Sequence, residues 1–526
     1  MTRRNAAFGP IPSRGFRRCR RAMQWALRVL MAYSAVLMVC VGNPAENSEG
    51  VVAAQEGRYE LGRRLRNFEM ALADQHSADS LQRATPYLND AVRDFFSMRW
   101  NEAAAALDMA RFNLISAERP SRELRWAASL SATPNTFLLD LESNEVGLTV
   151  TPFYSVAGEI PKGLKIEVVL RDEDQRPVAR VEFKPDSVPY RDLLPLGIRR
   201  EGDYALIADA VVDTHRVTIA QHRLSLAQKL KPRLQALRDG LRLLPEKPRN
   251  TQRATLEDYV AALSTLTHGG QLETAIRAVR LLEEAEQLLA AEQKNTKHFG
   301  RGRSGDFWLT LAQPTGNARV RLFAPEAAKS GQPLPLVIAL HGAGGSENMF
   351  FDAYGNGKII DLCRRRDWLV VAPAATFFGL GLSAQKIIDE VDALYPVDRT
   401  QVLVVGHSMG AGHAVRTAEL LTTPPRAVAA LGGGSRLRQP ERLRSIAVFV
   451  AAGSNDFLLD QAKTLAAALR KAGADPVEFR EYPNVEHLGI VQLALDDVFA
   501  FFDKQITASA TAAPIVDSSN GASVGD

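Results

Sequence analysis

Ser408 lies in the pentapeptide Gly-His-Ser-Met-Gly, which spans residues 406–410 and follows the apolar run 402–405. A serine hydroxyl is a weak nucleophile unless a neighbouring base takes its proton. A sharp turn between a buried strand and a helix would expose this hydroxyl at the edge of a sheet, and Gly406 and Gly410 would leave room for the turn. The pattern G-x-S-x-G therefore predicts that Ser408 is a catalytic nucleophile.

A second glycine-rich turn lies upstream and could stabilise the negative charge that forms on an attacked carbonyl oxygen. The apolar run 336–340 predicts a buried strand, and the next five residues read His-Gly-Ala-Gly-Gly. Such a turn brings a backbone N–H group close to the nucleophile. We expect the N–H groups of Ala343 and Met409 to form this oxyanion hole, each contributing on the order of 3 kcal/mol in the transition state. The residues expected to shape the turn are His341, Gly342, Gly344 and Gly345.

Two further strand-like runs place a carboxylate and an imidazole downstream of the serine. The run 446–452 precedes Asp456, and the run 477–482 precedes His487, the last histidine of the chain. The chain order is thus serine, aspartate, histidine. In such an arrangement, His487 would take the serine proton and Asp456 would hold the imidazole in the required tautomer. Asp460 is the alternative acid, and Asp456 could instead cap the helix predicted to follow it.

Residues 304–504 resemble the α/β-hydrolase superfamily, and within it the branch of polyhydroxybutyrate depolymerases and feruloyl-esterase-like carboxylesterases. The resemblance rests on the motifs at residues 340–345, 395–399, 406–410, 451–456 and 482–487. It implies a mostly parallel sheet with helices on both faces, a serine–histidine–aspartate triad and no cofactor. The chain departs from the family pattern at the acid turn before Asp456 and at Ala411, where many relatives have glycine.

The three candidate catalytic residues follow one another closely in the sequence, at positions 408, 456 and 487. Little chain is therefore available for a large lid, and we expect an open cleft and an ester substrate that can be bulky or polymeric. The same triad also cleaves amides, so a peptidase of the prolyl-oligopeptidase-like type is an alternative. A second alternative is a non-catalytic cell-surface binding protein with a hydrolase scaffold, because more than 200 residues precede this domain.

The composition argues against two other classes of function. Of the 526 residues, 46% are hydrophobic, and the net charge of +4 comes largely from an arginine-rich stretch near the N-terminus. The rest of the chain is close to neutral, so we expect no nucleic-acid partner. The histidines lack acidic or thiol partners at the spacing of metal ligands, so we also expect no metal site.

Residues 1–45 have the pattern of a signal peptide or an N-terminal membrane leader. The arginine-rich stretch ends at Arg28, the apolar run 29–41 follows, and Ala45 offers a small residue for cleavage. The apolar run is short for a membrane span. We expect export to the periplasm or the extracellular space, with membrane anchoring as the alternative if the leader is not cleaved.

The spacing of apolar residues changes twice between the leader and the hydrolase domain. Residues 56–132 and 227–298 show helical spacing, whereas residues 136–226 contain five or six short runs with a period of two. The sequence therefore predicts two helical regions that flank a β-sandwich-like module. Such a module could contact the cell envelope or carbohydrate.

Three finer features complete the prediction. Thr85-Pro86 predicts the start of a helix, because proline favours the first helical position. An apolar stripe from Leu272 to Leu289 predicts a helix with one buried face. Residues 505–526 are rich in alanine, serine and glycine and predict a disordered tail.

Overall fold

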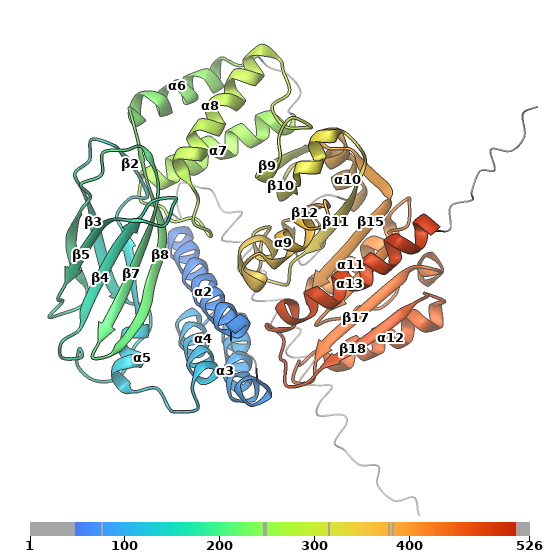
Figure 1. The fold of residues 1–526 in the computed structure, drawn as a ribbon, viewed down its shortest axis with the longest axis horizontal. Helices are drawn as coiled ribbons and strands as arrows, with labels where there is room; N and C mark the ends of the chain where they lie inside the picture. Colours follow the sequence, from blue (N-terminus) through green and yellow to red (C-terminus); the bar gives the residue numbers. More distant parts are fainter. Residues whose placement is uncertain are drawn as a thin grey trace, which may run out of the picture.

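The structure is a computed structural model that describes residues 48–511, except 75–76, 246–249, 314–315, 377–378 and 381–382. The predicted leader, residues 1–45, lies outside the described residues. In Figure 1 the C-terminal α/β part lies on the right and a β-rich part lies on the left, with a group of N-terminal helices between them.

An eight-stranded sheet supports the C-terminal part, in the order β18-β17-β16-β15-β11-β12-β10-β9. The strands are β9 (Gly305–Gln313), β10 (Gly316–Ala324), β11 (Leu334–Leu340), β12 (Leu369–Pro373), β15 (Val397–His407), β16 (Ala427–Leu431), β17 (Ala447–Gly453) and β18 (Val477–Tyr482). β9, β10 and β12 pair antiparallel, and all the other neighbours pair in parallel. A short hairpin of β13 (Ala375–Thr376) and β14 (Gly379–Leu380) follows β12. The mostly parallel sheet agrees with the fold class predicted for residues 304–504.

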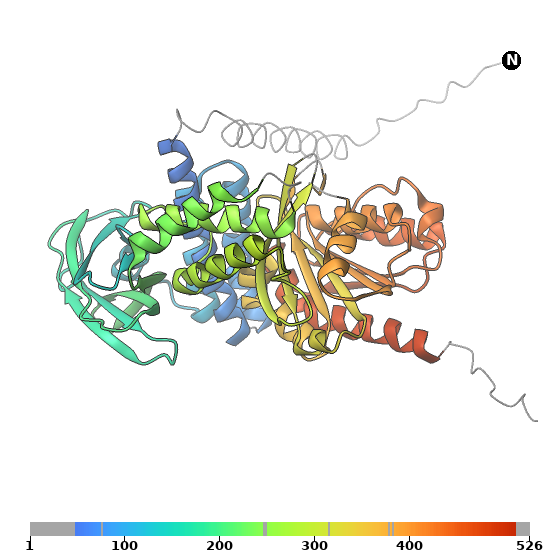
Figure 2. The same ribbon diagram turned by 90° about the horizontal axis from the view of Figure 1, so that it is seen from above.

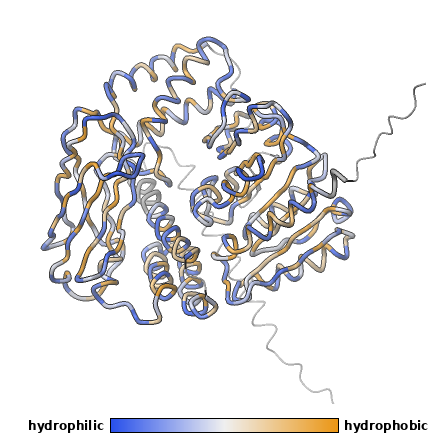
Figure 3. The backbone as a smooth tube through the Cα atoms, viewed as in Figure 1, coloured by the Kyte–Doolittle hydropathy of each residue, from blue (hydrophilic) through white to orange (hydrophobic). Residues whose placement is uncertain are grey.

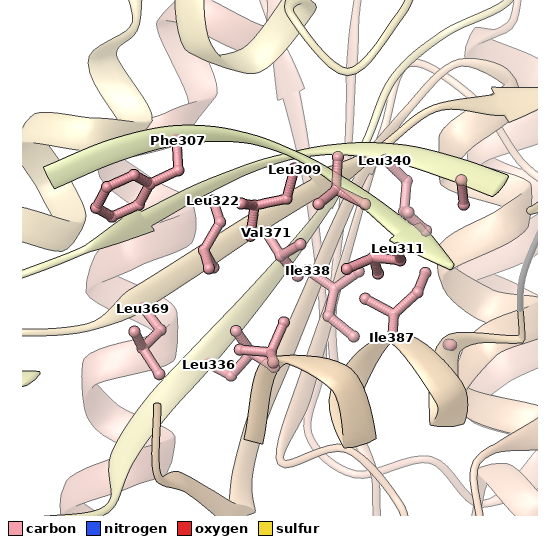
Figure 4. Packing of buried hydrophobic residues seen from close by; sticks show 14 of the residues in the cluster. Phe307, Leu309, Leu311, Leu322, Leu336, Ile338, Leu340, Leu369, Val371 and Ile387 are labelled. Carbon is pink, nitrogen blue, oxygen red and sulfur yellow. The ribbon is translucent and has the colours of Figure 1, made fainter. Parts of the chain in front are cut away.

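The central strands β11, β12, β16 and β17 are apolar along almost their whole length because helices cover both faces of the sheet. Leu336, Ile338 and Leu340 of β11 point into one hydrophobic cluster (Figure 4), while Val337 and Ala339 point into the other. Figure 3 shows hydrophobic residues along these strands. The first cluster includes α10 (Ala384–Leu394), α11 (Met409–Leu420) and α12 (Leu459–Ala472), and the second includes α9 (Lys358–Arg364) and α13 (Ile490–Thr511).

The parallel pairing brings the candidate site residues to one edge of the sheet. β11, β15, β17 and β18 run in the same direction, so their carboxyl ends lie on the same side. The turns that contain Ala343, Ser408, Asp456 and His487 follow these four ends. In open α/β sheets, this edge is where ligands bind.

The region predicted to be helical at 56–132 contains four helices. They are α2 (Ser48–Asp74), α3 (Ala78–Phe96), α4 (Trp100–Ile115) and α5 (Arg122–Ala128). The prediction that Thr85-Pro86 starts a helix is wrong, because α3 begins at Ala78, where the side chain of Ser77 accepts a hydrogen bond from the N–H of Ser80 (3.1 Å). A proline inside a helix costs about 3 kcal/mol. α3 nevertheless continues through Pro86 and buries Ala84, Leu88 and Val92.

The region 136–226 forms most of two sheets. One has the order β1-β3-β6 and the other the order β2-β8-β7-β4-β5. The strands are β1 (Leu130–Pro134), β2 (Leu138–Asp140), β3 (Glu145–Pro152), β4 (Lys165–Arg171), β5 (Pro177–Phe183), β6 (Tyr190–Pro195), β7 (Gly202–Val212) and β8 (His215–Ala227). Buried residues from both sheets belong to one hydrophobic cluster. The prediction of envelope or carbohydrate contact by this region stays a prediction.

The region 227–298 forms α6 (Leu230–Leu243), α7 (Thr251–Thr267) and α8 (Ala278–Lys294). The apolar stripe from Leu272 does not form one helix, because α8 begins only at Ala278. Its first N–H groups are held by a buried carboxylate: Asp203 of β7 accepts from Val279 (2.9 Å) and Arg280 (3.2 Å). The residues between α7 and α8 instead form a loop, in which Glu273 accepts a hydrogen bond from Asn348 (3.4 Å) of the C-terminal α/β part.

The second helical region shares a hydrophobic core with the eight-stranded sheet. The hydroxyl of Tyr259 on α7 donates to the carbonyl of Trp308 on β9 (2.8 Å), and the N–H of Thr310 donates to the hydroxyl of Thr255 (3.0 Å). Residues on both sides of position 300 therefore belong to one hydrophobic cluster.

The C-terminal helix differs from the prediction for the tail. α13 continues to Thr511, into the segment from 505 that the sequence assigns to disorder, and the residues after Thr511 lie outside the described part. Ile490 and Phe502 of this helix are fully buried. Among the described helices, none combines the length and the hydropathy needed to cross a membrane.

Candidate active site

Ser408 occupies a sharp turn between β15 and α11. Its backbone has φ 56° and ψ −116°, a conformation that is uncommon for a residue with a side chain, and its N–H donates to the carbonyl of Leu431 (2.8 Å). A Cβ on Gly406 would overlap the carbonyl of Gly410, and a Cβ on Gly410 would overlap the carbonyl of Leu340. Both glycines are therefore required for the close approach of strand and helix that exposes the serine.

His487 links the serine to a buried carboxylate. Its Nε2 lies 2.9 Å from Oγ of Ser408, and its Nδ1 lies 3.0 Å from Oδ1 of Asp456. Asp456 and His487 are 5% and 3% exposed, so both interactions are shielded from water. Burial alone would raise the pKa of Asp456, but His487 and the N–H of Leu458 together hold this pKa below its usual range. The carboxylate is thus kept ionised beside the imidazole.

The two alternatives for the acid lie in different places. Asp456 also accepts the N–H of Leu458 (2.8 Å), so the helix-capping contact and the histidine contact coexist on one oxygen. Asp460, the other candidate, is exposed on α12 and lines a separate hollow with Arg444 and Lys471. The structure therefore brings Asp456, and not Asp460, to the imidazole of His487.

A buried tyrosine and histidine support the loop that carries His487. The hydroxyl of Tyr354 lies 2.7 Å from Nδ1 of His407, and Nε2 of His407 lies 2.9 Å from the carbonyl oxygen of His487. Burial lowers the pKa of His407 to about 3, so this imidazole is neutral. It accepts from the tyrosine and donates to the carbonyl. Tyr354 was not predicted, because it lies between the recognised motifs.

The glycine-rich turn after β11 lies beside Ser408, and Ala343 lines the same cavity. His341 shapes the turn: its Nδ1 lies 2.8 Å from the carbonyl of Gly342, and its Nε2 accepts the N–H of Ala375 (2.9 Å). Burial lowers the pKa of His341 to about 4, which keeps it neutral. Met409, the other predicted donor, is the first residue of α11, where N–H groups have no intrahelical partner.

The remaining predicted glycines of this turn are closely surrounded. Gly344 has φ +77°, and a Cβ there would overlap the ring of Phe95. A Cβ on Gly345 would lie 2.7 Å from the side chain of Met349, and one on Gly342 would lie 3.3 Å from Cβ of Ser408. A side chain at any of these three glycines would therefore hinder the close approach of the turn to Ser408 and to α3.

A salt bridge from outside the hydrolase domain holds the outer side of this turn. Nη2 of Arg58 on α2 donates to the carbonyls of Gly344 (3.1 Å) and Gly345 (3.4 Å) and pairs with Glu273 (3.1 Å). Burial would raise the pKa of Glu273, but Arg58 holds it below its usual range. Sequence reasoning missed both residues, since more than 200 positions separate Arg58 from the turn.

The cleft is less open than the sequence predicts. The segments between the three site residues are short, but the N-terminal helices α2 and α3 pack against the loops that carry them. Thr85 donates to the carbonyl of Asn484 (3.3 Å), and Gln492 donates to the carbonyl of Glu69 (3.0 Å). The spacing within the hydrolase domain could not reveal a cover that comes from the other end of the chain.

A comparison with models of protein families agrees with this fold. The model of the alpha/beta hydrolase family matches residues 337–518. Similar solved structures include a ferulic acid esterase, which is 20% identical over 40% of this chain and 99% of its own, with a TM-score of 0.33. Another is a mutant of the feruloyl esterase module from Clostridium thermocellum complexed with sinapinate, which is 17% identical over 39% of this chain and 89% of its own, with a TM-score of 0.33. A thermostable esterase is 12% identical over 72% of this chain and 99% of its own, with a TM-score of 0.35. No curated protein sequence matches the chain. The C-terminal part of this chain is an α/β-hydrolase domain.

Proposed function

We propose that the chain is a serine hydrolase that cleaves carboxylic esters through an acyl-enzyme intermediate. The observation that carries the proposal is the continuous chain of contacts from Oγ of Ser408 through His487 to Asp456. All three lie at the carboxyl edge of the sheet, and Ser408 lines a cavity that can admit a substrate. Nucleophile, base and orienting acid are thus within hydrogen-bonding distance of one another.

In the first half of the reaction, Oγ of Ser408 attacks the ester carbonyl carbon while Nε2 of His487 takes the hydroxyl proton. Asp456 stabilises the resulting imidazolium. The N–H groups of Ala343 and Met409 stabilise the negative oxygen of the tetrahedral intermediate. When the intermediate collapses, the bond to the alcohol oxygen breaks, and His487 returns its proton to the leaving alcohol.

In the second half, water replaces the alcohol. His487 takes a proton from this water as it attacks the acyl-enzyme carbonyl, and the same two N–H groups stabilise the second tetrahedral intermediate. The bond between the acyl carbon and Oγ of Ser408 then breaks. The proton returns from His487 to the serine, and the carboxylic acid leaves.

The test is hydrolysis of p-nitrophenyl butyrate by the wild type and by Ser408→Ala. We expect kcat to fall on the order of 10⁶-fold, as in other enzymes of this chemistry. Ser330→Ala, at an exposed serine on the 3-10 helix η1 (Glu326–Ser330), is the control and should keep full activity. Persistent activity of Ser408→Ala would refute the mechanism. If a fluorophosphonate also failed to label wild-type Ser408, the non-catalytic scaffold would become the better explanation.

We also propose that the protein is exported, and that the two sheets of residues 130–227 form a β-sandwich-like module. The arginine-rich and apolar pattern of residues 1–45 supports export. N-terminal sequencing of the protein recovered from cell fractions tests it: a mature chain that begins near Glu46 outside the cytoplasm is the expected result. An intact leader in the membrane fraction would favour the anchor instead.

A further inference from the structure

The N-terminal helices contact the loops around Ser408 directly. In Figure 1 and Figure 2, α2, α3 and α4 lie between the β-rich part and the hydrolase domain. The ring of Phe95 on α3 packs on Gly344, and a Cβ on Gly489 would lie 3.6 Å from the side chain of Leu72 on α2. The hydrophobic cluster of these helices also contacts Met349 and Leu488 of the hydrolase domain. One group of helices therefore covers both the glycine-rich turn and the loop of His487.

A cavity of about 150 Å³ lies between the helices and Ser408. Its floor is formed by the glycine-rich turn, Ser408 and His487. The larger apolar side chains that the helices contribute are Leu61, Leu65, Val92, Phe95, Phe96 and Leu107. A cavity of roughly 150 Å³ with an apolar lining stays dry in another protein and holds a molecule of the size of benzene. The space next to the serine thus suits an apolar group of about six carbons.

Gly62 lies within α2 and lines this cavity. A glycine inside a helix costs about 1 kcal/mol relative to alanine. A Cβ at this position would meet only the guanidinium of Arg66, at 3.4 Å, so packing of the helix does not require glycine here. Gly57, one and a half turns earlier, would place a Cβ against the ring of Trp100 (3.6 Å) and does not line the cavity. The missing side chain of Gly62 therefore adds room to the cavity.

We propose that this cavity binds the acyl group of the substrate and that Gly62 sets the acyl length it accepts. The inference rests on the proposed serine esterase function. The acyl group stays in the site through both halves of the reaction and is bonded to Ser408 between them, whereas the alcohol must leave before water can enter. A mainly apolar space beside the serine therefore suits the acyl group, and the substrates are esters of acids with a short alkyl chain or a single ring.

A series of p-nitrophenyl esters, from acetate to dodecanoate, tests the proposal, because the alcohol stays constant. For the full-length wild type, we expect kcat/KM to rise by up to about fourfold for each methylene that enters the cavity, reach a maximum near hexanoate, and then fall. Gly62→Leu should lower the ratio of hexanoate to acetate hydrolysis by at least about tenfold. Gly62→Ala should lower the ratio less and fold at least as stably as the wild type, because alanine favours the helix. Gly57→Ala makes the same change in helix propensity outside the cavity and should leave the ratio unchanged.

Two results would overturn the proposal. One is a hexanoate-to-acetate ratio that is equal in the wild type, Gly62→Ala and Gly62→Leu. The other is a wild-type profile that is flat across acyl lengths but varies strongly in a second series with constant acetate and varied alcohols. The behaviour of Ser408 separates these results from failure of the proposed function. If Ser408→Ala is inactive and wild-type Ser408 is labelled by a fluorophosphonate, an unchanged ratio refutes only the assignment of the cavity.

Discussion

Replacing Glu69 by glutamine should stabilise the protein at alkaline pH. Glu69 lies on α2, is 1% exposed, and accepts the N–H of Gly355 in the hydrolase domain. Burial, with a smaller contribution from the carboxylate of Glu486, raises the pKa of Glu69 to about 8. The hydrogen bond from Gly355 and the charge of Arg66 act in the opposite direction. Burial also raises the pKa of Glu486 to about 7. Two buried carboxyl groups thus lie near the contact between α2 and the loop of His487.

The sign of the effect follows from proton binding. The ordinary pKa of a glutamate is 4.5, so between this value and about 8 the folded protein holds a proton on Glu69 that the unfolded chain has lost. The contribution of Glu69 to stability is therefore complete below pH 4.5 and is lost as the pH rises through 8. At about 1.4 kcal/mol for each pKa unit, the full difference is on the order of 5 kcal/mol.

Glutamine keeps the shape of the protonated side chain and cannot ionise. The protein relaxes around a buried charge and admits water, so the measured effect will be smaller than the full difference. We expect Glu69→Gln to raise the free energy of unfolding by about 1–3 kcal/mol at pH 9, and to change it little at pH 5. The amide oxygen of the glutamine can still accept the N–H of Gly355. The amide nitrogen takes the place of Oε1 of Glu69, which accepts no hydrogen bond from the described residues.

Urea unfolding at about pH 5, 7 and 9, followed by circular dichroism, measures the difference. Glu102→Gln makes the same chemical change at a position on α4 that is exposed to solvent. This variant should show no pH-dependent gain in the free energy of unfolding. A destabilisation by Glu69→Gln that is equal at all three pH values would refute the reasoning, as would a gain that is largest at pH 5.

Three further changes test the site. Asp456→Asn should lower kcat for p-nitrophenyl butyrate by roughly 10⁴-fold, because an amide does not hold the required tautomer or stabilise the imidazolium; steady-state kinetics measure this, and a loss below tenfold would contradict the orienting role. Gly406→Ala would push a methyl group into the carbonyl of Gly410. We expect it to cost more than about 3 kcal/mol, seen as a lower thermal midpoint, and a midpoint equal to that of the wild type would argue against the tight turn. Tyr354→Phe leaves the buried Nδ1 of His407 without its donor and should cost about 1–3 kcal/mol in urea unfolding; an unchanged midpoint would show that this contact contributes nothing.

The sheet of the hydrolase domain could be predicted from the sequence because its strands are buried on both faces. Runs such as 336–340 and 402–405 are apolar throughout, and each ends in a turn rich in glycine or polar residues. Parallel pairing then brings those turns to one edge of the sheet. Because Ser408, Asp456 and His487 each follow one of these strands, they lie close together. The short contacts among these three side chains follow from local motifs and from the topology of one fold.

The cover of the cleft could not be predicted in the same way. The pattern of α2 and α3 shows a buried face, but the period of a helix does not say which partner buries it. Contacts such as those of Arg58 with Gly344, and of Thr85 with Asn484, join positions nearly 300 or 400 residues apart. No local signal encodes such pairs. The start of α8 escaped prediction for a related reason, since Asp203, the carboxylate that holds its first N–H groups, comes from a distant strand.

The fixed position of α2 explains why its cover over Ser408 acts as a wall rather than a swinging lid. α2 also carries Arg63 and Arg64, both almost fully buried, which pair with Glu60 of the same helix, and Arg64 pairs in addition with Asp108 of α4 (2.9 Å). Breaking a buried ion pair costs about 3–5 kcal/mol, because a charge is left without its partner. The pairs with Glu60 lie within α2, but outward movement of the helix would break the pair of Arg64 with Asp108, the hydrogen bond from Arg63 to the carbonyl of Thr218 (2.9 Å) and that from Arg58 to the glycine-rich turn. The helix therefore holds the turn and the cavity in place before substrate arrives, and size selection by this cavity depends on which side chains face it rather than on how far a lid opens.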